Sequence, residues 1–278
     1  MEKMCKILCV SRSGYYKWIQ TKVDENSYQQ RRKALFARII WFFLDSKCRY
    51  GSPKITKLLQ REGWVVSERL VGILMSENGL RSCVSKKFRV NTTDSNHTLP
   101  IAPNVLNQNF HTTAPNKVWV TDITYIPCRA GRMYLASVLD LFTRKIVGWK
   151  LADRMTAELV LDALDQAYAS QQPPKGLIHH SDRGSQYASE TYREQLEKYH
   201  MKASMSRKGN CYDNACIESF HSVLKKEFIY CTKFHTKAQA QQEIFEYIEL
   251  FYNRKRIHGS LGYLSPEQFE ALYKKSIS

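Results

Sequence analysis

The stretch from residue 177 to residue 227 begins Leu177-Ile178-His179-His180-Ser181-Asp182-Arg183-Gly184 and ends Ile217-Glu218-Ser219-Phe220-His221-Ser222-Val223-Leu224-Lys225-Lys226-Glu227. Its first part is a short apolar run that stops at Asp182, which is typical of a buried strand with an acid at its end. Its second part carries apolar residues at helical spacing, which predicts an amphipathic helix with Glu218 near its start. Thirty-five residues separate Asp182 from Glu218.

A third acid, Asp122, interrupts the apolar segment Val118–Ile126, which reads as a strand. Aspartate is depleted in strands, and a carboxylate is rarely buried unless it is paired or binds a metal. The sequence therefore places three acids in a strand, at a strand end and on a helix, and these contexts suggest one shared site. The alternative is that they are three unrelated surface or capping acids.

Three carboxylates suit Mg²⁺, which prefers oxygen ligands and is typically held by one or two carboxylates together with substrate phosphate. Two such ions about 4 Å apart can clamp the attacking and the leaving oxygen of an in-line phosphoryl displacement. We expect Asp122 to bridge two Mg²⁺ ions, with Mn²⁺ a possible substitute, while Asp182 and Glu218 each complete one site.

The chain resembles the integrase-type Asp-Asp-Glu transposases, and more narrowly the second-frame protein of bacterial insertion sequences of the IS-three group. The resemblance rests on three blocks, Trp119-Val120-Thr121-Asp122-Ile123-Thr124-Tyr125, His180-Ser181-Asp182-Arg183-Gly184-Ser185-Gln186-Tyr187 and Lys208-Gly209-Asn210-Cys211-Tyr212-Asp213-Asn214-Ala215-Cys216-Ile217-Glu218-Ser219-Phe220. It implies a ribonuclease-H-like core and Mg²⁺-dependent DNA cleavage and strand transfer. It also implies a DNA-binding role for Lys225, seven residues after Glu218.

The predicted order of elements is consistent with that core. Three strands follow one another as hairpins, and alternating helices and strands come after them, as in an α/β protein with a ribonuclease-H-like mixed sheet. The predicted elements are strands 118–126, 133–141 and 145–151, helix 157–169, strand 176–180, helix 190–199 and strand 202–205. Asp140 lies at a strand end, where we expect a role in the turn rather than in catalysis.

Positive charge is concentrated near the N-terminus. Lys and Arg outnumber Asp and Glu by 42 to 26, which gives a net charge of +16, and residues 1–100 hold +11 of it. Such an excess of positive charge suits binding to a polyanion such as double-stranded DNA. The alternative is a soluble basic protein whose charge has no such role. Two short predicted helices around 53–79, joined across Gly63–Val66, fit a helix-turn-helix in which Lys54 and Arg69 would contact DNA. A helical hairpin can equally be scaffolding.

Further DNA contacts are expected close to the three acids. Arg207 and Lys208 lie in a polar, glycine-containing loop, and Asn214 follows that loop. Arg254 and Arg256 belong to a basic cluster that could meet phosphates or simply form a solvated helix end. Lys225 falls on the same helix face as Glu218, because seven residues turn a helix by about 700°, close to two full turns.

Composition and patterning divide the chain into three parts: a helical DNA-binding region at 1–85, a linker at 86–116, and a ribonuclease-H-like catalytic domain with a helical C-terminal tail at 117–278. No apolar run approaches the roughly 20 residues of a membrane span. Eight scattered cysteines without a Cys-x-x-Cys motif indicate reduced thiols. We therefore expect a cytoplasmic protein that joins the nucleoid when bound to DNA.

These observations predict a transposase catalytic subunit that cuts phosphodiesters at insertion-sequence ends and transfers the strand through the freed 3′-hydroxyl. Its expected partners are the element ends, target DNA, further copies of the chain on DNA, and an upstream-frame protein or frameshift fusion. One alternative is a structure-selective nuclease on the same fold, which fold alone does not separate from a transposase. Another is a non-catalytic DNA-binding regulator.

Overall fold

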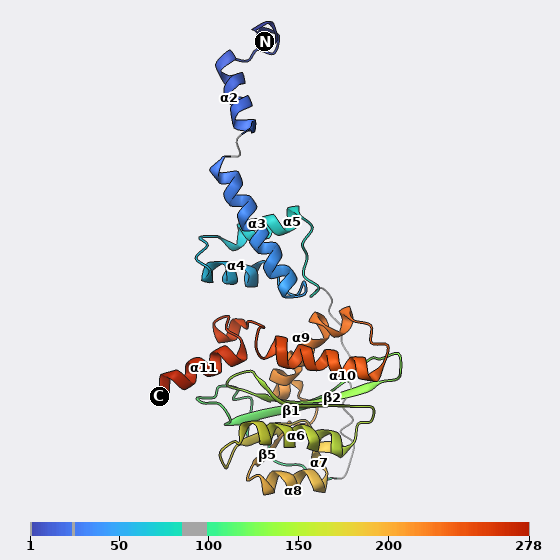
Figure 1. Ribbon diagram of the computed structural model, residues 1–278. Helices are drawn as coiled ribbons and strands as arrows, with labels where there is room; N and C mark the ends of the chain where they lie inside the picture. The colour runs from blue at the N-terminus through green and yellow to red at the C-terminus, as the bar shows by residue number, and fades with distance from the viewer. Residues whose placement is uncertain (1, 24–25, 85–98, 278) are drawn as a thin grey trace. The chain divides into compact units, whose positions relative to one another are not determined.

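A computed structural model describes residues 2–23, 26–84 and 99–277 of the chain (Figure 1). The chain divides into two compact units, Met1–Cys83 and Val84–Ser278, and each is described by itself. The predicted boundary between the helical region and the linker falls beside this division, although residues 85–98 of the linker lie outside the described residues.

The first unit is built of helices in its described part. These are α1 (Glu2–Ile7), α2 (Arg12–Val23), α3 (Ser27–Asp45), α4 (Ser52–Arg61) and α5 (Glu68–Glu77). The helix pair α4 and α5 is the one that the sequence predicts, and the Ser67 hydroxyl caps α5 by accepting from the Leu70 amide at 3.2 Å. Gly51 occupies the cap position of α4, and Ser52 is already helical.

The second unit contains a five-stranded sheet with the order β3-β2-β1-β4-β5. The strands are β1 (Val118–Ile126), β2 (Met133–Asp140), β3 (Ile146–Ala152), β4 (Ile178–Ser181) and β5 (Lys202–Met205). Strands β1, β2 and β3 pair antiparallel, whereas β4 runs parallel to both β1 and β5. This mixed sheet confirms the predicted α/β fold.

Helices cover both faces of the sheet (Figure 1). On one face lie α6 (Ala157–Gln171), the short α7 (Ser185–Ala188) and α8 (Glu190–Lys198), and on the other lies α9 (Ala215–Glu227). Because both faces are covered, the central strands are buried on both sides, and their sequences are nearly continuous apolar runs. The core between the sheet and α6 to α8 includes Trp119, Val138, Val147, Leu159, Leu164, Tyr187 and Tyr192.

Helix α6 approaches the sheet closely at Gly148 in β3. A Cβ atom there would lie 2.3 Å from the Ala163 carbonyl oxygen and 2.7 Å from the Ala167 backbone nitrogen, both in α6. Only glycine leaves room for this backbone contact.

The chain continues after α9 through η2 (Ile229–Cys231), α10 (Lys237–Phe245), η3 (Glu246–Tyr252), η4 (Gly259–Leu261) and α11 (Pro266–Ile277). The sequence predicts one helix over 237–252, but its last part, η3, is a π-helix. The wider turn of a π-helix brings Tyr247, Ile248, Phe251 and Tyr252 to the buried side together.

Residues 99–116 have no helix or strand, yet they pack against the second unit. The Val105 amide donates to the Ser204 hydroxyl of β5 at 2.9 Å. Asn104 and Gln108 donate to the two carboxylate oxygens of Asp213 at 2.9 and 2.7 Å. This half of the predicted linker is therefore fixed to the catalytic unit rather than running freely.

Within the described ranges, no helix combines the length and the apolar character needed to cross a membrane.

Candidate active site

The register of β1 against β4 leads toward Asp122 and Asp182. Strands β1 and β4 are parallel, and the last pair in their register is Val120 opposite His180. Asp122 is two residues beyond Val120 in β1, and Asp182 is two residues beyond His180, directly after the end of β4. Because the two acids stand at equal offsets from this pair, the register favours the same side of the sheet for both.

Helix α9 brings Glu218 to the same place. The helix begins where the Asn214 amide donates to the Thr121 carbonyl at 3.2 Å, directly before Asp122 in β1. One turn after Glu218, the His221 ring nitrogen Nδ1 lies 3.3 Å from Oδ2 of Asp122. Residues three apart are neighbours on a helix. The face of α9 that contacts Asp122 through His221 therefore also carries Glu218.

The buried His221 holds Asp122 in a fixed relation to the sheet. Its other ring nitrogen, Nε2, lies 3.3 Å from the Ser137 hydroxyl in β2, and Ser137 is the strand partner of Asp122. The imidazole thus bridges a carboxylate and a hydroxyl that face each other across two strands. Sequence analysis assigned no partner to His221; its spacing of three from Glu218 was the available signal.

The charges of the acids act on one another. Burial, and after it the negative charge of Asp122, raises the pKa of the Glu218 carboxyl above its ordinary value. The Glu218 side chain reaches the surface, but the surrounding protein removes enough water to raise the pKa. The buried Tyr187 has a pKa well above the usual value, mainly through burial, with smaller contributions from Tyr192, Asp122 and Asp182. Asp122 therefore acts electrostatically on Glu218, and Asp122 and Asp182 both act on Tyr187.

The turn after β4 is built around Asp182. Its Oδ1 accepts from the Gly184 amide at 2.9 Å. A Cβ atom at residue 184 would approach that same oxygen to 3.1 Å, so glycine keeps the turn tight. The neighbouring Arg183 donates through Nε to the Ser206 carbonyl at 2.6 Å, which fixes the turn to the end of β5.

Lys225 is half-buried near Asp122. Its Nζ is 4.5 Å from the centre of the Tyr125 ring. Burial lowers the pKa of the Lys225 ammonium, and the charge of Asp122 acts in the opposite direction.

The polar loop before α9 is held by the buried Asp213. Its carboxylate accepts from Arg207 at Nη2 (2.7 Å) and Nε (3.0 Å), and these contacts hold the pKa of Asp213 well below its usual range. Arg207, expected to contact DNA, thus fixes its own loop, while Lys208 next to it is exposed. The Asn214 side chain also anchors α9, and its Oδ1 is buried without a hydrogen-bond partner.

The remaining predicted DNA contacts are Arg254 and Arg256 in the second unit and Lys54 and Arg69 in the first. Arg254 is exposed, with its Nε 3.4 Å from Glu267. Arg256 is 7 % exposed and donates to both carboxylate oxygens of Glu227 at 2.8 Å. In the first unit, Lys54 lies on α4 with its Nζ 4.7 Å from the Tyr50 ring centre, and Arg69 is exposed at the start of α5.

Family models match three parts of the chain. A model described as "Integrase core domain" matches residues 112–211, and a second model with the same description matches residues 218–272. A model described as "HTH-like domain" matches residues 30–88.

Several named relatives match along nearly their whole length. The "Insertion element IS600 uncharacterized 31 kDa protein" of Shigella sonnei is 45% identical over 270 residues, covering 97% of this chain and 98% of the relative. The "Transposase InsF for insertion sequence IS3A" of Escherichia coli (strain K12) is 41% identical over 270 residues, covering 97% of this chain and 93% of the relative.

Among solved structures, the catalytic core of HTLV-2 integrase in complex with magnesium, in its trimeric form, gives a TM-score of 0.45 at 17% identity. That match covers 58% of this chain and 99% of the core. A chain from the structure of the simian T-cell lymphotropic virus intasome in complex with PP2A regulatory subunit B56 gamma gives a TM-score of 0.49 at 14% identity. That match covers 80% of this chain and 70% of the other.

Proposed function

This chain belongs to the IS3-group transposases with an integrase-type core, and on that premise we propose that Asp122, Asp182 and Glu218 form its metal-dependent catalytic site. The chain is a DNA transposase. The assignment of residues is supported by the register of β1 against β4, which leads toward Asp122 and Asp182, together with the contact of His221 in α9 with Asp122. Burial, and after it the negative charge of Asp122, raises the pKa of the Glu218 carboxyl, as expected for an acid near a second acid.

The donor set fits a hard divalent cation. All three side chains offer carboxylate oxygens, the ligands that Mg²⁺ and Mn²⁺ prefer. The buried Oδ1 of Asn214, which lacks a hydrogen-bond partner, is suited to accept from the water shell of such an ion. In the part of the chain that the structure describes, no three His, Cys, Asp or Glu side chains are close enough together to hold an ion. The proposal therefore requires the carboxylates to draw closer when ions and DNA bind.

Two divalent ions, when bound, would supply activation of the attacking oxygen and stabilisation of the leaving oxygen at the scissile phosphodiester. The residues of the chain act as orienting groups. His221 keeps the Asp122 carboxylate turned toward Glu218, the turn at Gly184 holds Asp182, and Lys225 binds a backbone phosphate of the strand that enters the site. No side chain needs to act as a covalent nucleophile, because water attacks in cleavage and the freed 3′-hydroxyl attacks in strand transfer.

DNA binding is divided between the two units in this proposal. The helix pair α4 and α5 carries Lys54 and Arg69 toward DNA, while Lys208 and Lys225 hold the strand near the carboxylates. We further propose that copies of the chain assemble on the element ends, and that an upstream-frame protein or a frameshift fusion supplies additional recognition of those ends. The DNA-bound protein would then be associated with the nucleoid.

The test compares DNA cleavage and DNA binding in variants that keep the shape of each acid. Asp122→Asn, Asp182→Asn and Glu218→Gln should each reduce cleavage of a duplex carrying the element's terminal repeat below detection, while binding to that duplex stays near the wild-type level. Asp162→Asn, at an exposed acid of α6 that pairs with Lys150, is the matched control and should cut normally. Wild-type cutting by any of the three variants would overturn the assignment of that residue.

A further inference from the structure

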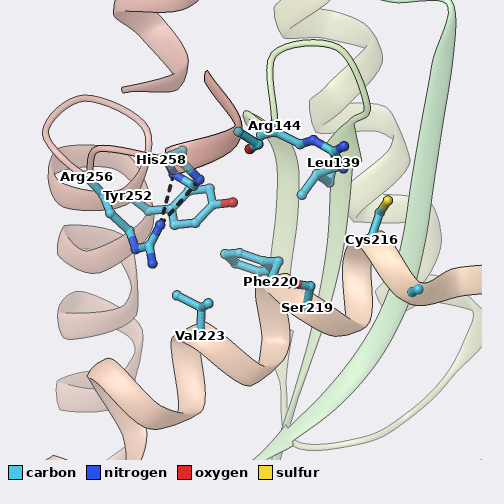
Figure 2. A pocket seen from close by; sticks show the side chains of 11 residues that line it. Leu139, Arg144, Cys216, Ser219, Phe220, Val223, Tyr252, Arg256 and His258 are labelled. Carbon is cyan, nitrogen blue, oxygen red and sulfur yellow. Dashed lines mark hydrogen bonds between the residues drawn. The ribbon is translucent and has the colours of Figure 1, made fainter. Parts of the chain in front are cut away.

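A cavity of about 320 Å³ lies against α9 (Figure 2). Its walls come from α9, from the end of β2 and the turn that follows it, and from the last residue of η3 and the segment after it. Figure 2 shows Ser219, Phe220 and Val223 of α9 facing Tyr252 and His258 across the cavity. The volume falls at the small end of the range for ligand pockets, about 300–1,000 Å³.

Helix α9 separates this cavity from the proposed catalytic site. Cys216, Ser219, Phe220 and Val223 are spaced i, i+3, i+4 and i+7, so they share one helix face, and all four line the cavity. Glu218, His221 and Lys225 occupy the opposite face, since each residue turns the helix by about 100°. The distance between the two places is therefore about the diameter of a helix with its side chains, 10–12 Å.

The floor of the cavity is apolar. Phe220 and Tyr252 pack edge to face, with ring centroids 4.8 Å apart, and Val223 and Leu139 extend that surface. These side chains offer a surface for an aromatic or sugar ring rather than for a solvated ion.

The rim is polar and positively charged. Arg144 stands at the β2–β3 turn, and the hydroxyls of Ser219 and Ser260 and the ring of His258 complete the rim. Arg256 also lines the cavity, but its charge is matched by Glu227. Among the described residues, none that lines the cavity is acidic. The site therefore suits a small group with a flat apolar body and an anionic end.

We propose that this cavity holds one nucleotide of the DNA strand, turned out of the duplex, with its base or sugar against Phe220 and Val223 and its phosphate at Arg144. This inference rests on the proposed function, in which DNA bound at the carboxylates lies about one helix width from the cavity. Successive nucleotides advance about 3.4 Å along each strand, so the helix width corresponds to about three or four nucleotides. The unstacking cost of a few kcal/mol is offset by contacts that only an extruded nucleotide can make.

The test places 2-aminopurine, whose fluorescence rises when it is unstacked, at each position near the cleavage site of a terminal-repeat duplex. With saturating wild-type chain, one position within about two to five nucleotides of the scissile phosphate should brighten about threefold or more. Val223→Trp fills the cavity and should abolish that signal. Arg144→Asn removes the cation and should weaken the signal, and asparagine tolerates the left-handed backbone at this residue (φ 60°).

Arg154→Asn, at an exposed arginine between β3 and α6, is the matched control and should leave the signal unchanged. If Val223→Trp fails to fold, as judged by circular dichroism, the comparison of Arg144→Asn with Arg154→Asn alone decides whether the nucleotide binds in the cavity. Wild-type chain that cuts the duplex without brightening any position would overturn the cavity proposal and leave the carboxylate site intact. Brightening that persists in both cavity variants would also overturn it, whereas cutting by Asp122→Asn would count only against the carboxylate site.

Discussion

Replacing Arg256 tests whether this arginine stabilises the fold or binds DNA. The Arg256 side chain is buried, and its Nε and Nη2 donate to the Glu227 carboxylate at 2.8 Å each. The Tyr247 hydroxyl gives Glu227 a third hydrogen bond, at 3.2 Å. The contact joins α9, which carries Glu218, to the segment after η3. The sequence alone suggested that Arg256 meets phosphates.

The expected loss of stability depends on the buried charge that each substitution leaves uncompensated. Arg256→Met takes the guanidinium away from a buried carboxylate, and removal of one partner from a buried ion pair costs about 3–5 kcal/mol. Glu227→Met leaves a buried guanidinium and should cost a similar amount. The double variant leaves no uncompensated charge, so it should be more stable than either single variant. For a unit of this size, where 1 kcal/mol shifts Tm by about 2–4 °C, the single variants should lose about 6–20 °C.

The assay is scanning calorimetry of the full chain, read at the transition of the unit Val84–Ser278. The matched control is Arg254→Met, at an exposed arginine whose single ion-pair contact with Glu267 spans 3.4 Å, which should cost less than about 1 kcal/mol. A Tm unchanged in Arg256→Met, together with weakened DNA binding, would refute the structural role and restore the phosphate-binding one.

Three further variants probe other parts of the account. Gly148→Ala should lower the free energy of unfolding in urea by about 1–3 kcal/mol because its Cβ would meet the α6 backbone. Gly259→Ala, with nothing within 4 Å of the new Cβ, should be neutral. Equal effects of the two variants would contradict the packing argument. Burial lowers the pKa of His179 to about 3 in the folded chain, whereas in the unfolded chain it is about 6.5. Between these two values only the unfolded chain protonates this histidine, so stability falls as the pH drops from about 6.5 toward 3. Between pH 7.5 and 5.5 this amounts to about 1.4 kcal/mol, which His179→Leu should remove from the pH dependence of urea unfolding. Lys225→Ala should slow strand transfer and weaken end binding in a salt-dependent manner. Lys225→Arg should retain much of the strand transfer and of the end binding. Joining at the wild-type rate by the alanine variant at physiological salt would show that Lys225 does not bind the DNA strand.

Local patterns in the sequence were enough to predict the sheet and the elements that carry the acids. The run Val118–Ile126 is apolar throughout because both faces of the central strand are covered, and the predicted strand matches β1 at both ends. Asp140 was expected to stabilise a turn, and its Oδ1 does accept from the amide and hydroxyl of Thr143, both at 2.8 Å. Each of these features is encoded within a few neighbouring residues.

What the sequence did not predict depends on partners far along the chain. Residues 99–116 show no periodicity, and their anchors at Ser204 and Asp213 lie about a hundred residues away. The basic cluster around Arg256 resembles a phosphate-binding surface until Glu227, 29 residues earlier, is placed against it. The contact of His221 with Asp122 likewise arises only when α9 docks on the sheet. Periodicity describes one element at a time, so it does not contain these contacts.

The most direct measurement of the central claim is an anomalous difference map from crystals of the chain grown with terminal-repeat DNA and Mn²⁺. The account predicts two peaks about 4 Å apart, with Asp122 contacting both and Asp182 and Glu218 each contacting one. Peaks located away from these carboxylates, or a metal site that excludes Asp122, would contradict it.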